Sequence, residues 1–154
     1  MQLIAEGKVL ELFIALKGAP KQLRDEIEVD ADGIIGDKFY AKDSNRAILL
    51  TSQESYDLAK QNGIAFEFGL LGENIILDIN PYGLSCGDRV EIGTIVLEIT
   101  QNCTICNSLS KIDKALPKLL QCDRGIFAKA LQSGVIKKDD KVKIYKRNDN
   151  EKDI

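Results

Sequence analysis

The clearest candidate for chemistry in this sequence is a pair of cysteines, Cys103 and Cys106, separated by two residues. The pair follows residues 94–100, which are typical of a strand, and precedes residues 107–121, which are typical of a helix. A thiol at the beginning of a helix meets unpaired N–H groups and the positive end of the helix dipole, which stabilise its thiolate. The position therefore predicts a reactive thiol.

Other interpretations of the cysteines stay open. Two such thiols often pack as small apolar residues. The same spacing also suits a dithiol redox switch that forms a reversible disulfide. A zinc site is disfavoured, because structural zinc usually takes two close pairs, whereas Cys86 and Cys122 stand alone and far apart.

A second feature is a set of turns that join glycine to an acidic residue. They are Gly33 to Gly36 with Asp37, Gly72-Glu73-Asn74 and Cys86-Gly87-Asp88. Glycine permits positive φ or a close backbone approach, and successive N–H groups in such turns can bind anions. Most such turns are only turns, and the sequence contains neither a Walker A motif nor G-x-G-x-x-G.

Isolated basic residues next to these turns form a third feature. Arg46 precedes an apolar run, and Arg89 and Arg124 stand near other turns. An arginine at the mouth of a buried strand can bind a phosphate or carboxylate in bidentate fashion. A salt bridge from Arg46 to Asp37 or Glu73 is an equal alternative.

Composition restricts the classes of function. The chain has 154 residues, which suit one domain, and its net charge of −3 provides no general field for nucleic acids. The absence of histidine excludes imidazole catalysis, and the absence of tryptophan leaves little material for stacking on single strands. Neither a secretory leader nor a membrane span is evident, so we expect a cytoplasmic protein with reduced thiols.

Hydrophobic patterns predict the elements that must position these residues. We expect early strands at 8–16 and 23–29, and a strand buried on both faces at 46–51. Thr51 and Glu54 form a capping-box signature, which predicts a helix over 52–62.

The second half of the chain alternates short strands with turns. Glycine and proline punctuate residues 69–100, which is the signature of a sandwich or barrel. We expect a helix over 107–121 that Pro117 kinks or divides, a helix or strand at 125–131 and a last strand at 142–146. The absence of βαβ alternation argues against a doubly wound sheet.

Six motifs in a fixed order resemble the MOSC domain, a module of molybdenum cofactor sulfurases and amidoxime-reducing proteins. They are GIIGDKF at 33–39, RAILLTSQE at 46–54, LLGENIIL at 70–77, LSCGDRVEIGTIVLEIT at 84–100, CTICNSL at 103–109 and RGIFAKALQSG at 124–134. The resemblance implies a mainly β (α+β), barrel-like fold of many short strands with two or three small helices. We expect one such domain over 1–146 and a polar, flexible tail over 147–154.

The resemblance also implies a function. It implies binding of a molybdenum-molybdopterin cofactor, or a sulfur-carrier role, through a reactive cysteine; a dithiol redox protein or small-molecule reductase is the alternative. If the domain is an enzyme, it would be a molybdenum-dependent reductase or a component of sulfur transfer. The implied partners are the small-molecule cofactor and a sulfur donor or molybdoenzyme, and we expect neither nucleic acid nor membrane as a partner.

The site residues carry over from the family by position. By its spacing to the following leucine, the family's cysteine falls on Cys106, which would be the metal ligand or persulfide-bearing thiol, with Cys103 as an additional catalytic thiol. Thiolates suit molybdenum or sulfane sulfur, while backbone nests and an arginine suit a phosphate. The expected cofactor-binding residues are Arg46, Asp37, Gly36, Glu73, Asn74 and Arg124.

The chain departs from the family at one motif position and in its domains. Many family members have histidine where Phe39 stands, so any role of that imidazole is absent here. The sulfurases carry an additional domain that binds pyridoxal phosphate, and the amidoxime-reducing proteins carry an additional N-terminal domain. We expect neither in this chain.

Overall fold

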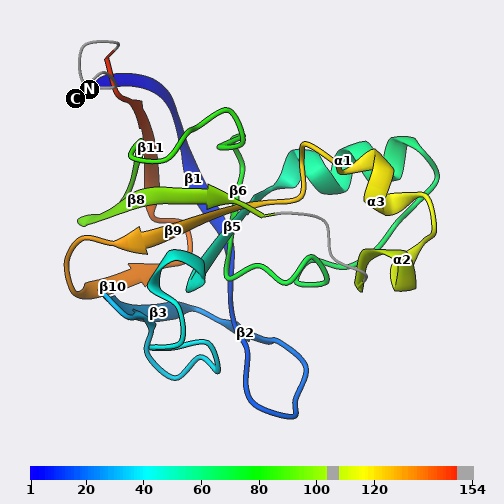
Figure 1. Ribbon diagram of the computed structural model, residues 1–154, viewed down its shortest axis with the longest axis horizontal. Coiled ribbons are helices and arrows are strands. Elements are labelled where there is room, and N and C mark those ends of the chain that lie inside the picture. Colours follow the sequence, from blue (N-terminus) through cyan, green and yellow to red (C-terminus); the bar gives the residue numbers. More distant parts are fainter. Residues whose placement is uncertain (104–107, 149–154) are drawn as a thin grey trace.

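A closed barrel of seven strands forms the body of the protein, in a computed structural model that describes residues 1–103 and 108–148 (Figure 1). Around the barrel the strands follow the order β11, β7, β8, β9, β5, β6 and β1, and β1 pairs again with β11. Their bounds are β1 Gln2–Ile14, β5 Ile48–Ser52, β6 Ile75–Leu77, β7 Arg89–Ile92, β8 Ile95–Asn102, β9 Ile126–Ala130 and β11 Lys141–Lys146. Neighbouring strands are antiparallel except for β5 and β6, which are parallel.

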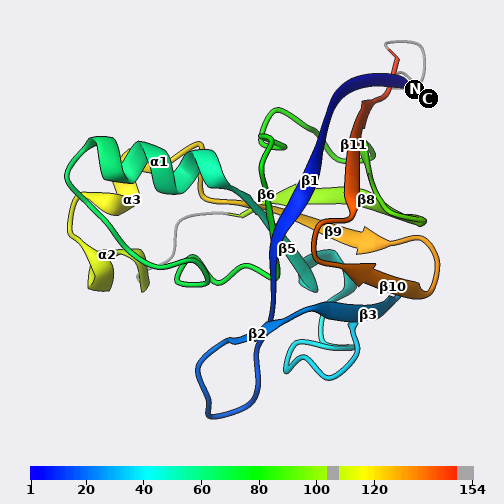
Figure 2. The same cartoon turned by 180° about the vertical axis from the view of Figure 1, so that it is seen from behind.

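Smaller elements surround the barrel. Strand β2 (Gln22–Arg24) pairs with β1, and β3 (Glu26–Asp30), β4 (Gly33–Ile34) and β10 (Gly134–Lys137) make a separate three-stranded sheet. Helices α1 (Gln53–Gln61), α2 (Ser108–Ile112) and α3 (Leu116–Leu119) gather on one side of the barrel, as Figures 1 and 2 show from opposite directions. A short 3₁₀ turn, η1 (Ser44–Arg46), leads into β5.

Alternating apolar residues build the barrel core. In β8, Ile95, Leu97 and Ile99 are buried while the residues between them are partly exposed. Val142 and Ile144 of β11 repeat the same pattern. Successive side chains of a strand point to opposite faces, so this period of two places one face of each strand inside the barrel.

A second apolar cluster lies beneath the helices. Its buried members include Phe13, Tyr56, Leu71, Leu109 and Leu116. All five residues of β5 are buried, and Ile48 and Leu50 belong to the barrel core, which confirms an expected strand with two covered faces, although it begins at Ile48 and not at residue 46. The helical side is thus held to the barrel by apolar burial, with about 1.5–3 kcal/mol expected for each large side chain.

Helix α1 begins one residue later than its expected capping signature indicates. The helix is capped by Ser52, whose Oγ accepts a hydrogen bond from the Glu54 N–H at 3.1 Å, and not by Thr51. Thr51 still belongs to β5, and its hydroxyl donates to the Glu73 carboxylate at 2.8 Å. The N-cap is therefore Ser52, one residue after the expected Thr51, because the Thr51 hydroxyl is bonded to the buried Glu73 carboxylate.

Several other expected elements differ in extent. Strand β1 begins at Gln2, well before residue 8, and the ambiguous stretch at 125–131 contains strand β9. The expected helix over 107–121 is divided: α2 ends at Ile112, and α3 holds Pro117 in its first turn, where a missing N–H breaks no helical bond. Strand β10 was not expected.

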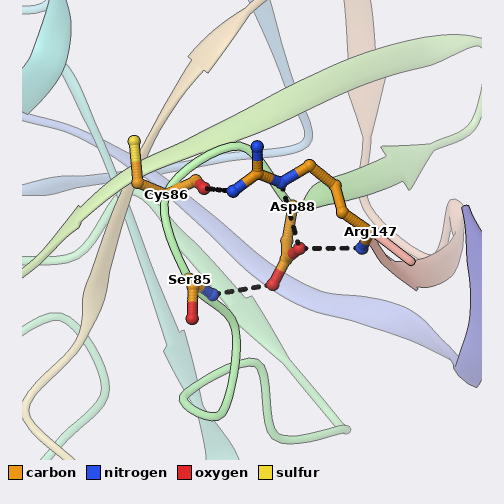
Figure 3. A network of polar contacts seen from close by, with 4 residues as sticks. All are labelled: Ser85, Cys86, Asp88 and Arg147. Atoms are coloured by element: carbon orange, nitrogen blue, oxygen red, sulfur yellow. Dashed lines mark hydrogen bonds and ion pairs between the residues drawn. The ribbon is translucent and has the colours of Figure 1, made fainter. Parts of the chain in front are cut away.

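The end of β11 is anchored by a buried carboxylate (Figure 3). Asp88 is fully buried and accepts hydrogen bonds from the N–H groups of Ser85 at 2.8 Å and Arg147 at 2.9 Å. The Arg147 guanidinium donates to the Cys86 carbonyl at 2.7 Å, while the Cys86 sulfur points away from this network. Arg147 is therefore tied to the barrel, and residues 149–154 of the expected tail lie outside the described residues.

Within the described ranges, no helix is long and apolar enough to span a membrane.

Candidate functional site

A cavity of about 540 Å³ lies where several loops meet one end of the barrel. Its walls come from the β1–β2 connection, the segment that leads through η1 into β5, the turn before β6, the end of β8 and strand β9. The volume falls within the range of about 300–1,000 Å³ that is usual for small-molecule sites. Apolar side chains such as Phe39, Leu49, Leu71 and Phe127 share the walls with charged ones.

Positive charge dominates the polar part of the walls. The cationic lining residues are Lys21, Lys38, Lys42, Arg46 and Arg124. Among the described lining residues the one carboxylate is Asp43, which accepts a hydrogen bond from the Asn45 N–H at 3.0 Å and so caps η1. A chain with a net charge of −3 therefore carries a concentrated positive site, which is suited to an anion.

Lys21 is the most enclosed lysine of this cavity. Its Nζ donates a hydrogen bond to the Glu73 carbonyl oxygen at 3.0 Å. Burial lowers the pKa of Lys21, and the more distant carboxylates of Asp37 and Glu73 oppose that effect in part. Sequence reasoning missed this residue because a single lysine in a loop has no recognisable pattern.

Arg46 stands at the exposed rim of the cavity. It ends η1, and its guanidinium lies over the Phe127 ring, 5.0 Å from the ring centroid. None of the ion pairs formed among the described residues joins it to Asp37 or Glu73. The stacking holds the planar guanidinium beside the cavity, where its N–H groups are placed to bind an oxyanion.

Arg124 enters the cavity from a buried position. Only 5% of the residue is exposed, and it lines the wall just before β9. A Cβ on Gly72 would lie 3.8 Å from Arg124 Nη2, so this turn passes close to the guanidinium. Gly72 also has a φ of 87°, a left-handed conformation that side chains seldom adopt.

Asn74 joins three parts of the site. Its Oδ1 accepts from the Leu49 N–H at 3.0 Å, and its Nδ2 donates to the Phe13 carbonyl at 3.3 Å and to Asp37 at 3.4 Å. It therefore connects β5, β1 and the segment after β4. Asn74 also contributes to the cavity wall.

Asp37 stands behind the cavity wall. It is 5% exposed, and its carboxylate accepts from the N–H groups of Ala15 at 2.6 Å and Phe39 at 3.0 Å. These bonds fasten the segment that carries Lys38 and Phe39 to the end of β1. Gly36, with a φ of 92°, turns the chain just before Asp37 and does not line the cavity.

Glu73 faces the helical side. It is fully buried, and its Oε2 accepts hydrogen bonds from the hydroxyls of Thr51 and Tyr56. Burial, followed by the charge of Glu73, raises the pKa of Tyr56. The cavity lining does not include Gly36, Asp37 or Glu73. Their expected role in cofactor binding therefore stays a prediction.

One of the two predicted catalytic thiols lies on the cavity. Cys103 is half-buried, lines the wall and donates its backbone N–H to the Gly125 carbonyl at 3.0 Å. Cys106, the predicted metal ligand, lies outside the described residues. Cys86 and Cys122 are exposed and free, and neither lines the cavity.

Comparison with known proteins decides the family. The family model described as "MOSC domain" matches residues 36–143. The chain belongs to the MOSC domain family.

Solved structures show the same fold as this MOSC domain. The YuaD protein from Bacillus subtilis (APC1665) superposes with a TM-score of 0.84 at 18% identity, covering 96% of this chain and 100% of that one. YiiM from Geobacillus stearothermophilus gives 0.64 at 20% identity, covering 92% and 74%, and YiiM from Escherichia coli gives 0.65 at 18% identity, covering 92% and 71%. No protein of curated function matches the chain.

The MOSC domain thus has a cavity lined by cations, with Cys103 among its lining residues. Arg46, Asn74, Arg124 and Cys103 were expected from the sequence and meet at this cavity. Lys21, Lys42 and Phe127 were not expected, although the family model covers the last two. The arrangement can hold an oxyanion on its cations and pack a planar group against its aromatic rings.

Proposed function

We propose that this MOSC domain binds a molybdopterin-type cofactor, with the cofactor's phosphate in the cationic cavity and a cysteine thiol as metal ligand or sulfur carrier. MOSC domains are associated in general with molybdenum-cofactor binding and sulfur transfer. The observation that carries the proposal is the convergence of five cations on one cavity of about 540 Å³ in an acidic chain.

The residues present fit such a group. Arg46 and Arg124 can each offer several N–H donors to a phosphate, and Lys21 adds a third positive charge. The rings of Phe39 and Phe127 offer apolar faces to a planar heterocycle. Cys103 supplies a soft sulfur ligand on the same wall.

When bound, such a cofactor would supply two-electron chemistry at its molybdenum. The contribution of the chain is to hold the phosphate, orient the ring system and present a thiolate. The assignment of Cys106 as metal ligand or persulfide stays a prediction from the family's motif.

The proposal extends to compartment and partners. Among the described residues, Cys86 and Cys122 are free thiols, as expected for a protein whose cysteines are kept reduced. A cytoplasmic location would keep them so. A sulfur donor or a molybdoenzyme that receives the loaded cofactor is the corresponding protein partner.

Cofactor loading tests the proposal directly. The protein is expressed in a host that makes the cofactor, and molybdenum content and pterin fluorescence are measured after purification. We expect stoichiometric pterin in the wild type, loss of molybdenum or cyanide-releasable sulfur in Cys106→Ala and partial loss in Cys103→Ala. Cys122→Ala is the matched control, since that exposed thiol lies away from the cavity.

Two outcomes would contradict the proposal. One is a wild type that carries neither pterin, molybdenum nor releasable sulfur. The other is equal loading in the wild type, Cys103→Ala and Cys106→Ala, which would remove both thiols from the proposed function.

A further inference from the structure

Lys21 differs from the other cations of the cavity in its surroundings. It lies in the β1–β2 connection, directly before β2, whereas Lys38, Lys42 and Arg46 are exposed. Its Nζ donates a hydrogen bond to a neutral carbonyl, that of Glu73, at 3.0 Å. The ammonium group is thus enclosed without a charged acceptor at contact distance, which disfavours its charged form.

The carboxylates around Lys21 are engaged with other donors. Asp37 accepts from two backbone N–H groups, and Glu73 accepts from two hydroxyls. Lys38 and Arg124 face Lys21 with charges of the same sign. None of the ion pairs among the described residues includes Lys21.

We propose that Lys21 takes up a proton when a doubly charged oxyanion enters the cavity, so that anion binding by this domain is coupled to proton uptake. This inference rests on the proposed function in so far as the oxyanion is the phosphate of the cofactor. The proton comes from solvent and forms an N–H bond with the lone pair of the Lys21 amine. The oxyanion forms no covalent bond, and it supplies a charged acceptor next to Lys21, whose hydrogen-bond acceptor in the free protein is the neutral Glu73 carbonyl.

Linkage gives the sign of the effect. An anion beside Lys21 stabilises its ammonium form, so the pKa of Lys21 is higher in the complex than in the free protein. Between the two values, binding weakens as pH rises, by up to about tenfold in Kd for each pH unit. Arg46 and Arg124 keep their charge over this range and set the part of the affinity that does not depend on pH.

Sulfate is the probe that isolates this effect. It is a tetrahedral dianion whose charge does not change between pH 7 and pH 10, whereas phosphate changes its own protonation near neutrality. The protein is prepared with lysines labelled with ¹³C at Cε, whose chemical shifts report protonation of the amine. Lysine signals are titrated with and without saturating sodium sulfate, at ionic strength matched with sodium chloride, and Kd is measured across the same pH range.

Two substitutions identify the responsible group. Lys21→Arg keeps a positive charge that does not titrate in this range, and its missing signal assigns Lys21. Lys42→Arg is the matched control, because it makes the same change at an exposed lysine of the same cavity. Circular dichroism checks that both variants are folded, and any proton uptake by the Cys103 thiolate would persist in Lys21→Arg.

We expect sulfate to move the Lys21 midpoint upward by at least about 0.5 pH and to move Lys42 less. We also expect the pH dependence of Kd to flatten in Lys21→Arg and to persist in Lys42→Arg. The inference is overturned if sulfate binds with no change in the Lys21 midpoint, if the pH dependence survives in Lys21→Arg, or if sulfate does not bind. Coupled sulfate binding without cofactor loading would instead count against the proposed function alone.

Discussion

Glu73 and Asn74 are neighbours in sequence, yet they belong to two polar regions of opposite character. On the helical side, Glu73 accepts from Thr51 and Tyr56, and the Tyr82 hydroxyl lies 2.6 Å from Ser55 Oγ. On the other side, Asn74 borders a cavity whose described lining contains five cationic residues and one carboxylate.

The contrast separates a structural network from a binding site. On the helical side, the buried hydroxyls of Thr51 and Tyr56 have a partner within the protein, since both donate to Glu73 Oε2. The described lining of the cavity holds more cationic than anionic side chains, which suits an anionic ligand. Substitutions on the two sides should therefore change different quantities.

The largest effect is expected from removing Glu73. Glu73→Ala leaves the buried hydroxyls of Thr51 and Tyr56 without their acceptor, which should lower the free energy of unfolding by about 2–5 kcal/mol. Glu73→Gln keeps one acceptor oxygen and should lose less. Urea denaturation measures both changes, while sulfate affinity of the folded protein should stay within about threefold.

A different outcome would show that Glu73 acts in binding at the cavity and not in stability. That outcome is a stability close to wild type combined with a large loss of sulfate or cofactor binding. It would restore the role in cofactor binding that the motif GEN at 72–74 predicted.

Removing Arg46 should weaken binding and leave stability nearly unchanged. Arg46→Ala takes a charge-assisted contact from the ligand and should weaken phosphate or cofactor retention by about 1.5–3 kcal/mol. Because Arg46 is exposed and stacks only on Phe127 among described partners, stability should fall by no more than about 1 kcal/mol. Retention of pterin fluorescence during gel filtration and thermal melting measure the two quantities.

Arg46→Lys sharpens this prediction. An ammonium keeps the charge but not the bidentate fork, so it should recover part of the lost affinity. If Arg46→Ala instead melts at a much lower temperature with unchanged retention, the residue is structural, and the cavity has lost one of its proposed binding groups.

The strands of the barrel could be predicted where their patterns are local. Residues 94–100 and 142–146 alternate in polarity, and the run at 46–51 is apolar from Ala47 to Leu50, so these patterns indicate which residues are buried. The first half of β1 is largely exposed and stays a strand because it pairs with β11, which no local pattern shows. Strand β10 has four residues and depends in the same way on β3.

Some residues of the candidate site could also be predicted from local motifs, and others could not. Arg46, Asn74 and Arg124 lie in recognisable motifs, so the family pattern indicated them. Lys21 reaches the cavity only because the β1–β2 connection folds back beside Glu73 and Asp37. Which way Glu73 and Asn74 face also depends on tertiary structure, since both adjacent side chains are polar and both are buried.

The smallest expected effect is a difference in alkaline stability that belongs to the helical side. Burial and the Glu73 charge raise the pKa of Tyr56 above 10, its usual value in an unfolded chain. Below pH 10 the hydroxyl is protonated in both states; above it, the unfolded state loses the proton first, so unfolding becomes more favourable as pH rises. The stabilising difference between wild type and Tyr56→Phe should therefore shrink above pH 10, by at most about 1.4 kcal/mol per pH unit. Urea denaturation of both proteins from pH 8 to pH 11 measures this change, and parallel curves would show that Glu73 does not hold the Tyr56 hydroxyl in its protonated form.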